Sequence, residues 1–98
     1  NQLIVSQDSE DLNSDWLTTQ TINWLVREPP LPFRCTAKVR YRQSDQPCCV
    51  QQTTNGGYRI EFETPQRAVT PGQYVCLYAG SLCLGGGVID ARGSSRSI

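Results

Sequence analysis

Four cationic side chains recur at even positions of the segment F-R-C-T-A-K-V-R-Y-R, residues 33–42: Arg34, Lys38, Arg40 and Arg42. The odd positions of the segment are apolar or aromatic. Because successive side chains of a β-strand point to opposite faces, a strand here would bury one side and present a cationic row on the other. At about 3.3 Å per residue the row would span roughly 26 Å, which several consecutive phosphates match. The pattern allows two interpretations: a contact with RNA or DNA, or a charged face that meets solvent and protects a sheet edge.

The chain offers little for catalysis. It contains no histidine, so a histidine-based triad or dyad cannot form within it. Glu61 and Glu63 lie beside Arg59 at a spacing typical of surface charge pairing rather than of an acid–base pair. The glycines at 85–87 lack the spacing of a phosphate-binding loop, so we interpret them as a bulge or a barrel corner. We therefore expect neither a catalytic nor a cofactor-binding residue here.

The five cysteines form an odd set without any C-x-x-C spacing. Because histidine is absent as well, the usual zinc patterns are missing and we expect no metal site. Most of these cysteines stand among apolar residues, where a free thiol packs as a small hydrophobic group. The sequence shows neither the pattern of a secretory signal nor an apolar run of about 20 residues, the length of a membrane helix. Together these features predict reduced structural thiols in a cytoplasmic protein that does not contact the membrane.

Length and charge suggest one small domain with a polar lead-in. The chain has 98 residues and a net charge of zero. Residues 1–15 carry four carboxylates and no Lys or Arg, so the remaining residues carry a net charge of +4. A charge of that size is weak evidence for nucleic-acid binding. Because the chain begins at Asn1 rather than at Met, we expect it to be part of a longer protein.

Short β-rich segments separated by turn signals run along the whole chain, and none has a convincing helical pattern. Asn55-Gly56 predicts a tight hairpin turn, Pro71-Gly72 predicts a type II turn, and 64–66 predicts a strand break. The sequence thus predicts an all-β fold, a small antiparallel barrel or sandwich of six or seven strands. We expect these strands near residues 2–6, 19–25, 33–42, 47–53, 58–63, 74–79 and 82–89, and residues 67–69 could add a short further strand.

Three motifs in this order resemble a known family: R-C-T-A-K-V-R-Y-R-Q at 34–43, A-V-T-P-G-Q at 68–73 and Y-x-G-x-x-C-L-G-G-G-x-I at 78–89. The chain is similar over nearly its whole length to the C-terminal part of tRNA-specific 2-thiouridylase of the bacterial type. The same family bears the older name tRNA (5-methylaminomethyl-2-thiouridylate)-methyltransferase. One departure is Cys49, which stands where the family commonly has threonine.

The resemblance implies a β-barrel similar to the second domain of elongation factor Tu over residues 18–90. Residues 1–17 would end a central domain, and residues 91–98 would form a disordered tail. Enzymes of this family use ATP with magnesium to adenylate the wobble uridine of tRNA, and a protein persulfide then supplies the sulfur. The implied partners are tRNA, an upstream ATP-pyrophosphatase domain of the same monomeric chain and the sulfur-donor protein. The ATP-binding loop and both catalytic cysteines belong to upstream regions, so this chain alone would be non-catalytic.

In that family the barrel contacts tRNA at positions that match Arg40, Tyr41 and Gln73. The resemblance leaves Arg34, Lys38 and Arg42 as additional phosphate contacts. The alternative is a barrel that braces the larger enzyme or binds a protein partner without contacting RNA.

Overall fold

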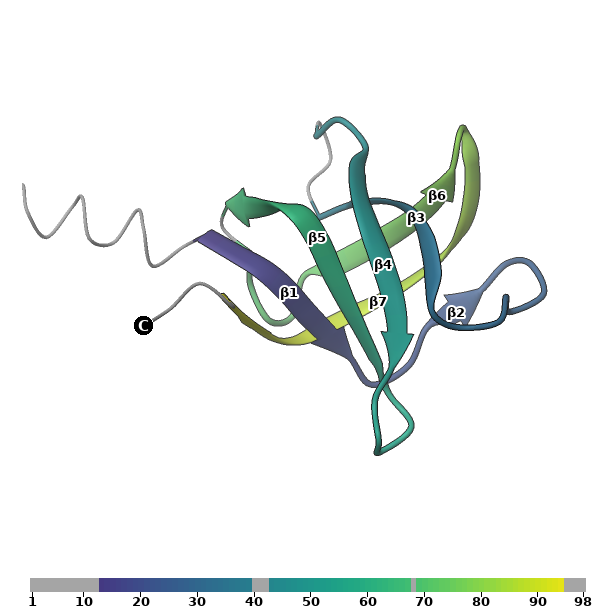
Figure 1. Ribbon diagram of the computed structural model, residues 1–98, viewed down its shortest axis with the longest axis horizontal. Helices are drawn as coiled ribbons and strands as arrows, with labels where there is room; N and C mark the ends of the chain where they lie inside the picture. Colours follow the sequence, from purple (N-terminus) through teal and green to yellow (C-terminus); the bar gives the residue numbers. More distant parts are fainter. Residues whose placement is uncertain (1–12, 40–42, 68, 95–98) are drawn as a thin grey trace, which may run out of the picture.

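The computed structural model describes residues 13–39, 43–67 and 69–94. All regular elements in these ranges are β-strands, which confirms the predicted all-β class (Figure 1). No helix that could span a membrane occurs among them. The strands are β1 (Asn13–Thr19), β2 (Asn23–Trp24), β3 (Phe33–Lys38), β4 (Gln46–Gln52), β5 (Tyr58–Arg67), β6 (Tyr74–Ala79) and β7 (Leu82–Gly93).

Six of the strands close into an antiparallel barrel. They pair in the order β1-β5-β4-β3-β6-β7, and β1 also pairs with β7, so the sheet returns to its first strand. The short β2 adds to β7 as a further strand. In Figure 1, β4 and β5 cross in front of β6 and β7. Because closure leaves no open edge on the six strands, the barrel rather than the sandwich is confirmed.

Side chains alternate between the barrel interior and the outside, as the pleat of a strand requires. On β6, Val75 and Leu77 are fully buried while Tyr74 is exposed. β3 follows the same rule, so the predicted two-faced strand is confirmed over its described length. The interior side chains form one core: Leu17, Ile22, Ala37, Val39, Cys48, Val50, Tyr58, Ile60, Phe62, Val69, Val75, Leu77, Leu84 and Ile89.

β3 ends at Lys38, earlier than the predicted strand 33–42. The backbone N–H of Val39 donates to Oε1 of Gln43 at 2.8 Å. A side-chain acceptor thus takes the place of a neighbouring strand, and the ladder stops there. The predicted strand at residues 2–6 lies outside the described residues.

The barrel extends beyond the expected range 18–90 at both ends. β1 begins at Asn13, in the stretch that was expected to belong to a preceding domain. Residues 91–93, expected in a disordered tail, are paired instead, because Trp16 lies opposite Gly93 in the β1–β7 ladder. Their polar composition resembles that of a tail. Backbone pairing needs only a partner strand, however, and β1 supplies it from the far end of the sequence.

Two predicted strand boundaries shift for local reasons. The single strand expected at 19–25 is divided between the end of β1 and β2. β5 runs through the predicted break at 64–66, because Ser14 pairs with Gln66 while Trp16 pairs with Glu61, and the residues between bulge from the ladder. Pro65 lies in this bulge, where its missing N–H costs no ladder hydrogen bond.

The glycines of β7 allow other parts of the chain to approach its backbone. A Cβ atom on Gly85 would lie 2.3 Å from the Asn23 carbonyl oxygen, and one on Gly87 would lie 2.4 Å from the Thr21 carbonyl oxygen. The β6–β7 ladder also shifts register nearby. Other backbone segments therefore pack closely against the glycine run. This agrees with the prediction of a bulge or a barrel corner.

Candidate nucleic-acid interface

Three of the predicted contact residues, Arg40, Tyr41 and Arg42, lie outside the described residues. The structure does describe Val39 and Gln43, which stand on either side of them. The hydrogen bond from the Val39 N–H to the Gln43 side chain joins these two positions. It fixes the points from which the chain leaves for residues 40–42 and to which it returns.

A hydrogen-bonded network of glutamines holds Gln43 in place at this end of the barrel. Gln43 Nε2 donates to Oε1 of Gln66. Gln66 Nε2 donates in turn to Oε1 of Gln46 at 3.1 Å and to the Thr64 carbonyl at 2.7 Å. Gln66 is only 3% exposed, and a buried amide is tolerated because its hydrogen bonds are made. The sequence alone does not mark Gln66 as a positioning residue. The sequence indicates this role only weakly, because the residues around Gln66 are typical of a strand break.

Gln73 closes the predicted type II turn, which is confirmed. Its N–H donates to the Thr70 carbonyl at 3.1 Å, and Gly72 adopts a φ of 94°, near the value that the third position of this turn requires. The Gln73 carbonyl accepts a hydrogen bond from the Ile89 N–H at 2.7 Å. Gln73 itself is exposed. The turn therefore holds its backbone firmly and leaves its side chain available to a partner.

The topology brings Gln73 to the end of the barrel where β3 ends. Lys38, the last residue of β3, pairs with Cys76 near the start of β6, the strand that Gln73 immediately precedes. β3 itself ends at this same end of the sheet (Figure 1). Two segments far apart in the sequence thus reach one end of the sheet, which a shared contact surface requires.

The two described members of the cationic row are each paired with a carboxylate. Arg34 forms an exposed ion pair with Glu63. Lys38 Nζ lies 3.5 Å from Oδ1 of Asp45 and 5.3 Å from the centre of the Tyr78 ring. The outer face of β3 is therefore locally neutral over this length. Exposed pairs of this kind are weak, so a phosphate could compete for the cations at little cost.

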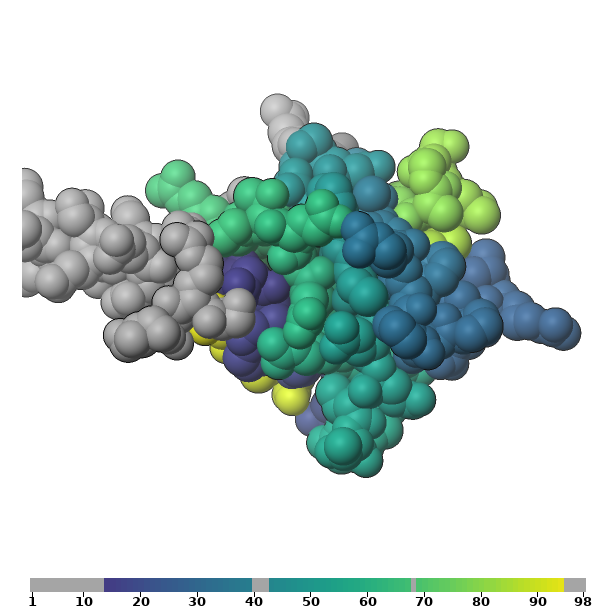
Figure 2. Space-filling view, viewed as in Figure 1, coloured from purple at the N-terminus to yellow at the C-terminus, as the bar shows by residue number. Residues whose placement is uncertain are grey.

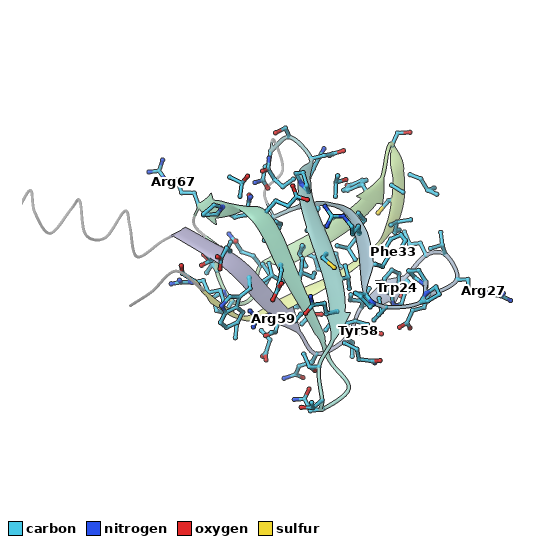
Figure 3. All side chains as sticks on the ribbon, in the orientation of Figure 1. Trp24, Arg27, Phe33, Tyr58, Arg59 and Arg67 are labelled. Atoms are coloured by element: carbon cyan, nitrogen blue, oxygen red, sulfur yellow. The ribbon has the colours of Figure 1, made fainter. Side chains whose placement is uncertain are left out.

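Three further arginines, Arg27, Arg59 and Arg67, do not gather around β3. Arg59 Nε lies 2.8 Å from Oε2 of Glu61, the surface pairing that the sequence predicts, and its guanidinium lies 4.6 Å from the centre of the Trp16 ring. Figure 3 shows Arg27 and Arg67 at opposite ends of the molecule. The ion pairs therefore mix both signs of charge along β3 and β5, strands that form part of the face in Figure 2.

The proline-rich connector after β2 is held against the barrel by a short hydrogen-bond chain (Figure 3). Trp24 Nε1 donates to the Tyr58 hydroxyl at 3.4 Å, and that hydroxyl donates to Oε2 of Glu28 at 3.2 Å. An open groove of about 880 Å³ runs along the connector, lined by Arg27, Glu28, Pro29, Pro30, Leu31, Pro32, Gln51 and Gln52. Its carboxylate is already used to hold the connector, and its lining contains no serine, cysteine or lysine that could act as a nucleophile.

Comparisons with known proteins identify the barrel. Residues 14–89 match the family model described as an aminomethyltransferase β-barrel domain. The tRNA-specific 2-thiouridylase MnmA of Pseudomonas fluorescens is 56% identical over 93 residues, which cover 92% of this chain and 24% of that protein. MnmA of Acinetobacter baylyi is 49% identical over 96 residues, covering 91% of this chain and 26% of the relative. MnmA of Xanthomonas oryzae is 49% identical over 94 residues, covering 93% and 25%.

The chain thus spans about a quarter of the length of the curated relatives it matches. The resemblance drawn from the three motifs is confirmed, since the matched region includes all of them and the relatives carry the expected family name. The chain belongs to the aminomethyltransferase β-barrel domain family, in the form that is part of tRNA-specific 2-thiouridylases.

Proposed function

We propose that this barrel is the tRNA-contacting part of a cytoplasmic enzyme that installs 2-thiouridine at the wobble position of tRNA. The observation that carries the proposal is the 56% identity with a tRNA-specific 2-thiouridylase over 92% of this chain. Adenylation of the uridine by ATP with magnesium, and sulfur transfer from a protein persulfide, are assigned to the remaining three quarters of such a protein. Within it the barrel would pack beside the ATP-pyrophosphatase domain.

The glycine run at 85–87 does not fit a phosphate-binding loop. A phosphate-binding loop leaves the faces of its glycines open to the ligand. Here the space beside Gly85 is filled by the Asn23 carbonyl, and the space beside Gly86 by the Val75 carbonyl at 2.4 Å. No catalytic step is therefore assigned to these residues, and the role proposed for them is to hold RNA.

Three residues are proposed as the direct contacts. Arg40 would pair with a backbone phosphate, Tyr41 would stack on a base, and the exposed amide of Gln73 would hydrogen-bond to a base or ribose edge. The fixed turn under Gln73 and its position at the end of β3 support this assignment. Arg34, Lys38 and Arg42 would add general attraction to phosphate.

Arg40→Ala is expected to weaken tRNA binding about tenfold and to lower the log–log salt slope by roughly one, because one released counterion is lost with each phosphate contact. Gln73→Ala is expected to weaken binding several-fold without changing the slope, because an amide neutralises no phosphate. The measurement is fluorescence anisotropy of labelled tRNA titrated with the 98-residue chain over a series of salt concentrations. An unchanged affinity and slope for Arg40→Ala would remove the phosphate contact from the proposal.

Glu63→Gln is expected to strengthen tRNA binding about two- to threefold, because Arg34 then loses its carboxylate partner and becomes available to phosphate. The free energy of unfolding should change by less than about 0.5 kcal/mol, since both members of the pair are exposed. Glu28→Gln is the matched control. It removes the same charge from the connector, where the Glu28 carboxylate accepts a hydrogen bond from Tyr58 and Arg34 keeps its own partner Glu63. Equal gains for the two variants would assign the effect to net charge rather than to Arg34.

A second candidate function is a barrel that only braces the larger enzyme or binds a protein. The observation in its favour is the local neutrality of the outer face of β3, where carboxylates accompany both described cations. It predicts that Arg40→Ala and Gln73→Ala leave tRNA affinity intact. The anisotropy titration thus separates the two functions.

A further inference from the structure

Cys35 and Cys48 lie directly opposite each other on β3 and β4. Their Sγ atoms are 3.8 Å apart. In-register residues of an antiparallel pair have Cα atoms about 4.5–5.5 Å apart, and a disulfide accepts Cα separations of about 4.4–6.8 Å. The backbone is therefore already in place for a bond between these two sulfurs, and only side-chain rotation is needed to close it.

The two thiols differ in exposure and in acidity. Cys48 is 2% exposed and belongs to the core, whereas Cys35 is only half-buried and packs at the core's margin. The hydrogen bond from the Cys48 thiol lowers the pKa of Cys35, against the opposing effect of desolvation. The same bond, together with burial, raises the pKa of Cys48. The thiolate, which is the reactive form of cysteine, therefore forms at the more accessible sulfur.

Cys49 and Cys76 are placed differently. Cys49 follows Cys48 but points to the other face of β4, where it pairs in register with Arg34 and Glu61. Cys76 lies on the outer face of β6, where burial raises its pKa. A thiolate at Cys35 thus has a sulfur 3.8 Å away inside the barrel, on the facing strand.

We propose that Cys35 and Cys48 form a redox-active dithiol site that closes a reversible disulfide between β3 and β4 on reaction with a small disulfide of the glutathione type. The inference is independent of RNA binding and sulfur transfer. It assigns a modification site to two residues that the family resemblance leaves without a role.

The exchange would proceed in two balanced steps. The Cys35 thiolate attacks one sulfur of oxidised glutathione, forms a mixed disulfide and releases one glutathione thiolate. Cys48 then gives up its proton to solvent and attacks the Cys35 sulfur, which releases the second glutathione thiolate. Both released thiolates can take up a proton, so two protein thiols are oxidised and one small disulfide is reduced to two thiols. The new bond would close a loop that contains residues 39–45, the connection between β3 and β4.

The test incubates the folded 98-residue chain with glutathione at several ratios of oxidised to reduced form, followed by acid quenching and intact mass measurement. We expect a product lighter by two hydrogens, with glutathione absent, and a Cys35–Cys48 linkage in the peptide map. Two of the five thiols should no longer react with maleimide. The product should revert fully when reduced glutathione is restored.

Two variants sharpen the result. In Cys48→Ala the reaction should stop at a stable mixed disulfide on Cys35, because Cys49 points away and cannot resolve it. Cys49→Ser should still form the disulfide. This variant controls for any general effect of substituting a cysteine on β4. The proposal is overturned if the wild-type chain keeps both thiols free under oxidising ratios, or if the linkage joins Cys76 and Cys83. A glutathione adduct on Cys35 that persists in the wild-type chain would also overturn it, because Cys48 would then have failed to resolve it.

Discussion

Gly85→Ala is expected to lower the free energy of unfolding by about 3 kcal/mol or more, a large share of the 5–15 kcal/mol typical of a small domain. The new Cβ would lie 2.3 Å from the Asn23 carbonyl oxygen, and Gly85 adopts a φ of 144° that side-chain-bearing residues rarely adopt. Either β2 leaves β7 or the β7 backbone shifts. Urea unfolding followed by tryptophan fluorescence measures the loss.

Gly72→Ala is the matched control for this substitution. Gly72 also has a positive φ, of 94°, but a Cβ there would meet no atom within 4 Å. It should cost only the backbone strain, about 1–2 kcal/mol. The difference between the two variants thus isolates the steric approach of β2. Equal losses at both sites would contradict the close packing described for the glycine run.

Leu77→Ala is expected to destabilise the barrel by about 3–4 kcal/mol, because Leu77 is fully buried and its removal leaves a cavity in a tightly packed interior. The expected signature is a lower urea midpoint with an unchanged slope. Leu77 lies on β6, which pairs with both β3 and β7, so neighbouring strands can collapse little around the cavity.

Leu82→Ala provides the comparison on the same hairpin. Leu82 is 57% exposed, so the same substitution should cost less than about 1 kcal/mol. Losses of similar size at the two positions would mean that the inside and outside faces of β6 and β7 are wrongly distinguished. A much smaller loss at Leu77 would mean that the interior is looser than its burial indicates.

Features that depend on neighbouring residues could be predicted from the sequence. The alternation on β3, the apolar strand from Tyr74 to Ala79 and the Pro71-Gly72 turn all follow from side-chain periodicity or from backbone preference. These local signals were sufficient for the all-β class and for most of the strands. The three motifs indicated the family, since together they span most of the matched range of residues 14–89.

Features that depend on distant partners could not be predicted. The pairing of β1 with β7 brings residues near 16 and 93 together. Nothing in the residues of either segment indicates that the other is its partner. The ion pair of Arg34 with Glu63 spans from β3 to β5, and Lys38 pairs with Asp45, so the described part of a row that is cationic in sequence is neutral in space. Gln66 gained its positioning role only because folding places it against Gln43 and Gln46.

By itself the sequence determined the fold class, the family and the residues proposed to contact tRNA, because each depends on the order and type of residues along the chain. The tertiary structure alone decided that the barrel closes through β1 and β7. It also decided that Gln73 stands at the end of β3, that carboxylates accompany Arg34 and Lys38, and that two thiols face each other 3.8 Å apart. The physical reason is that cross-strand register joins residues far apart in sequence, and register is set by the packing of the whole barrel.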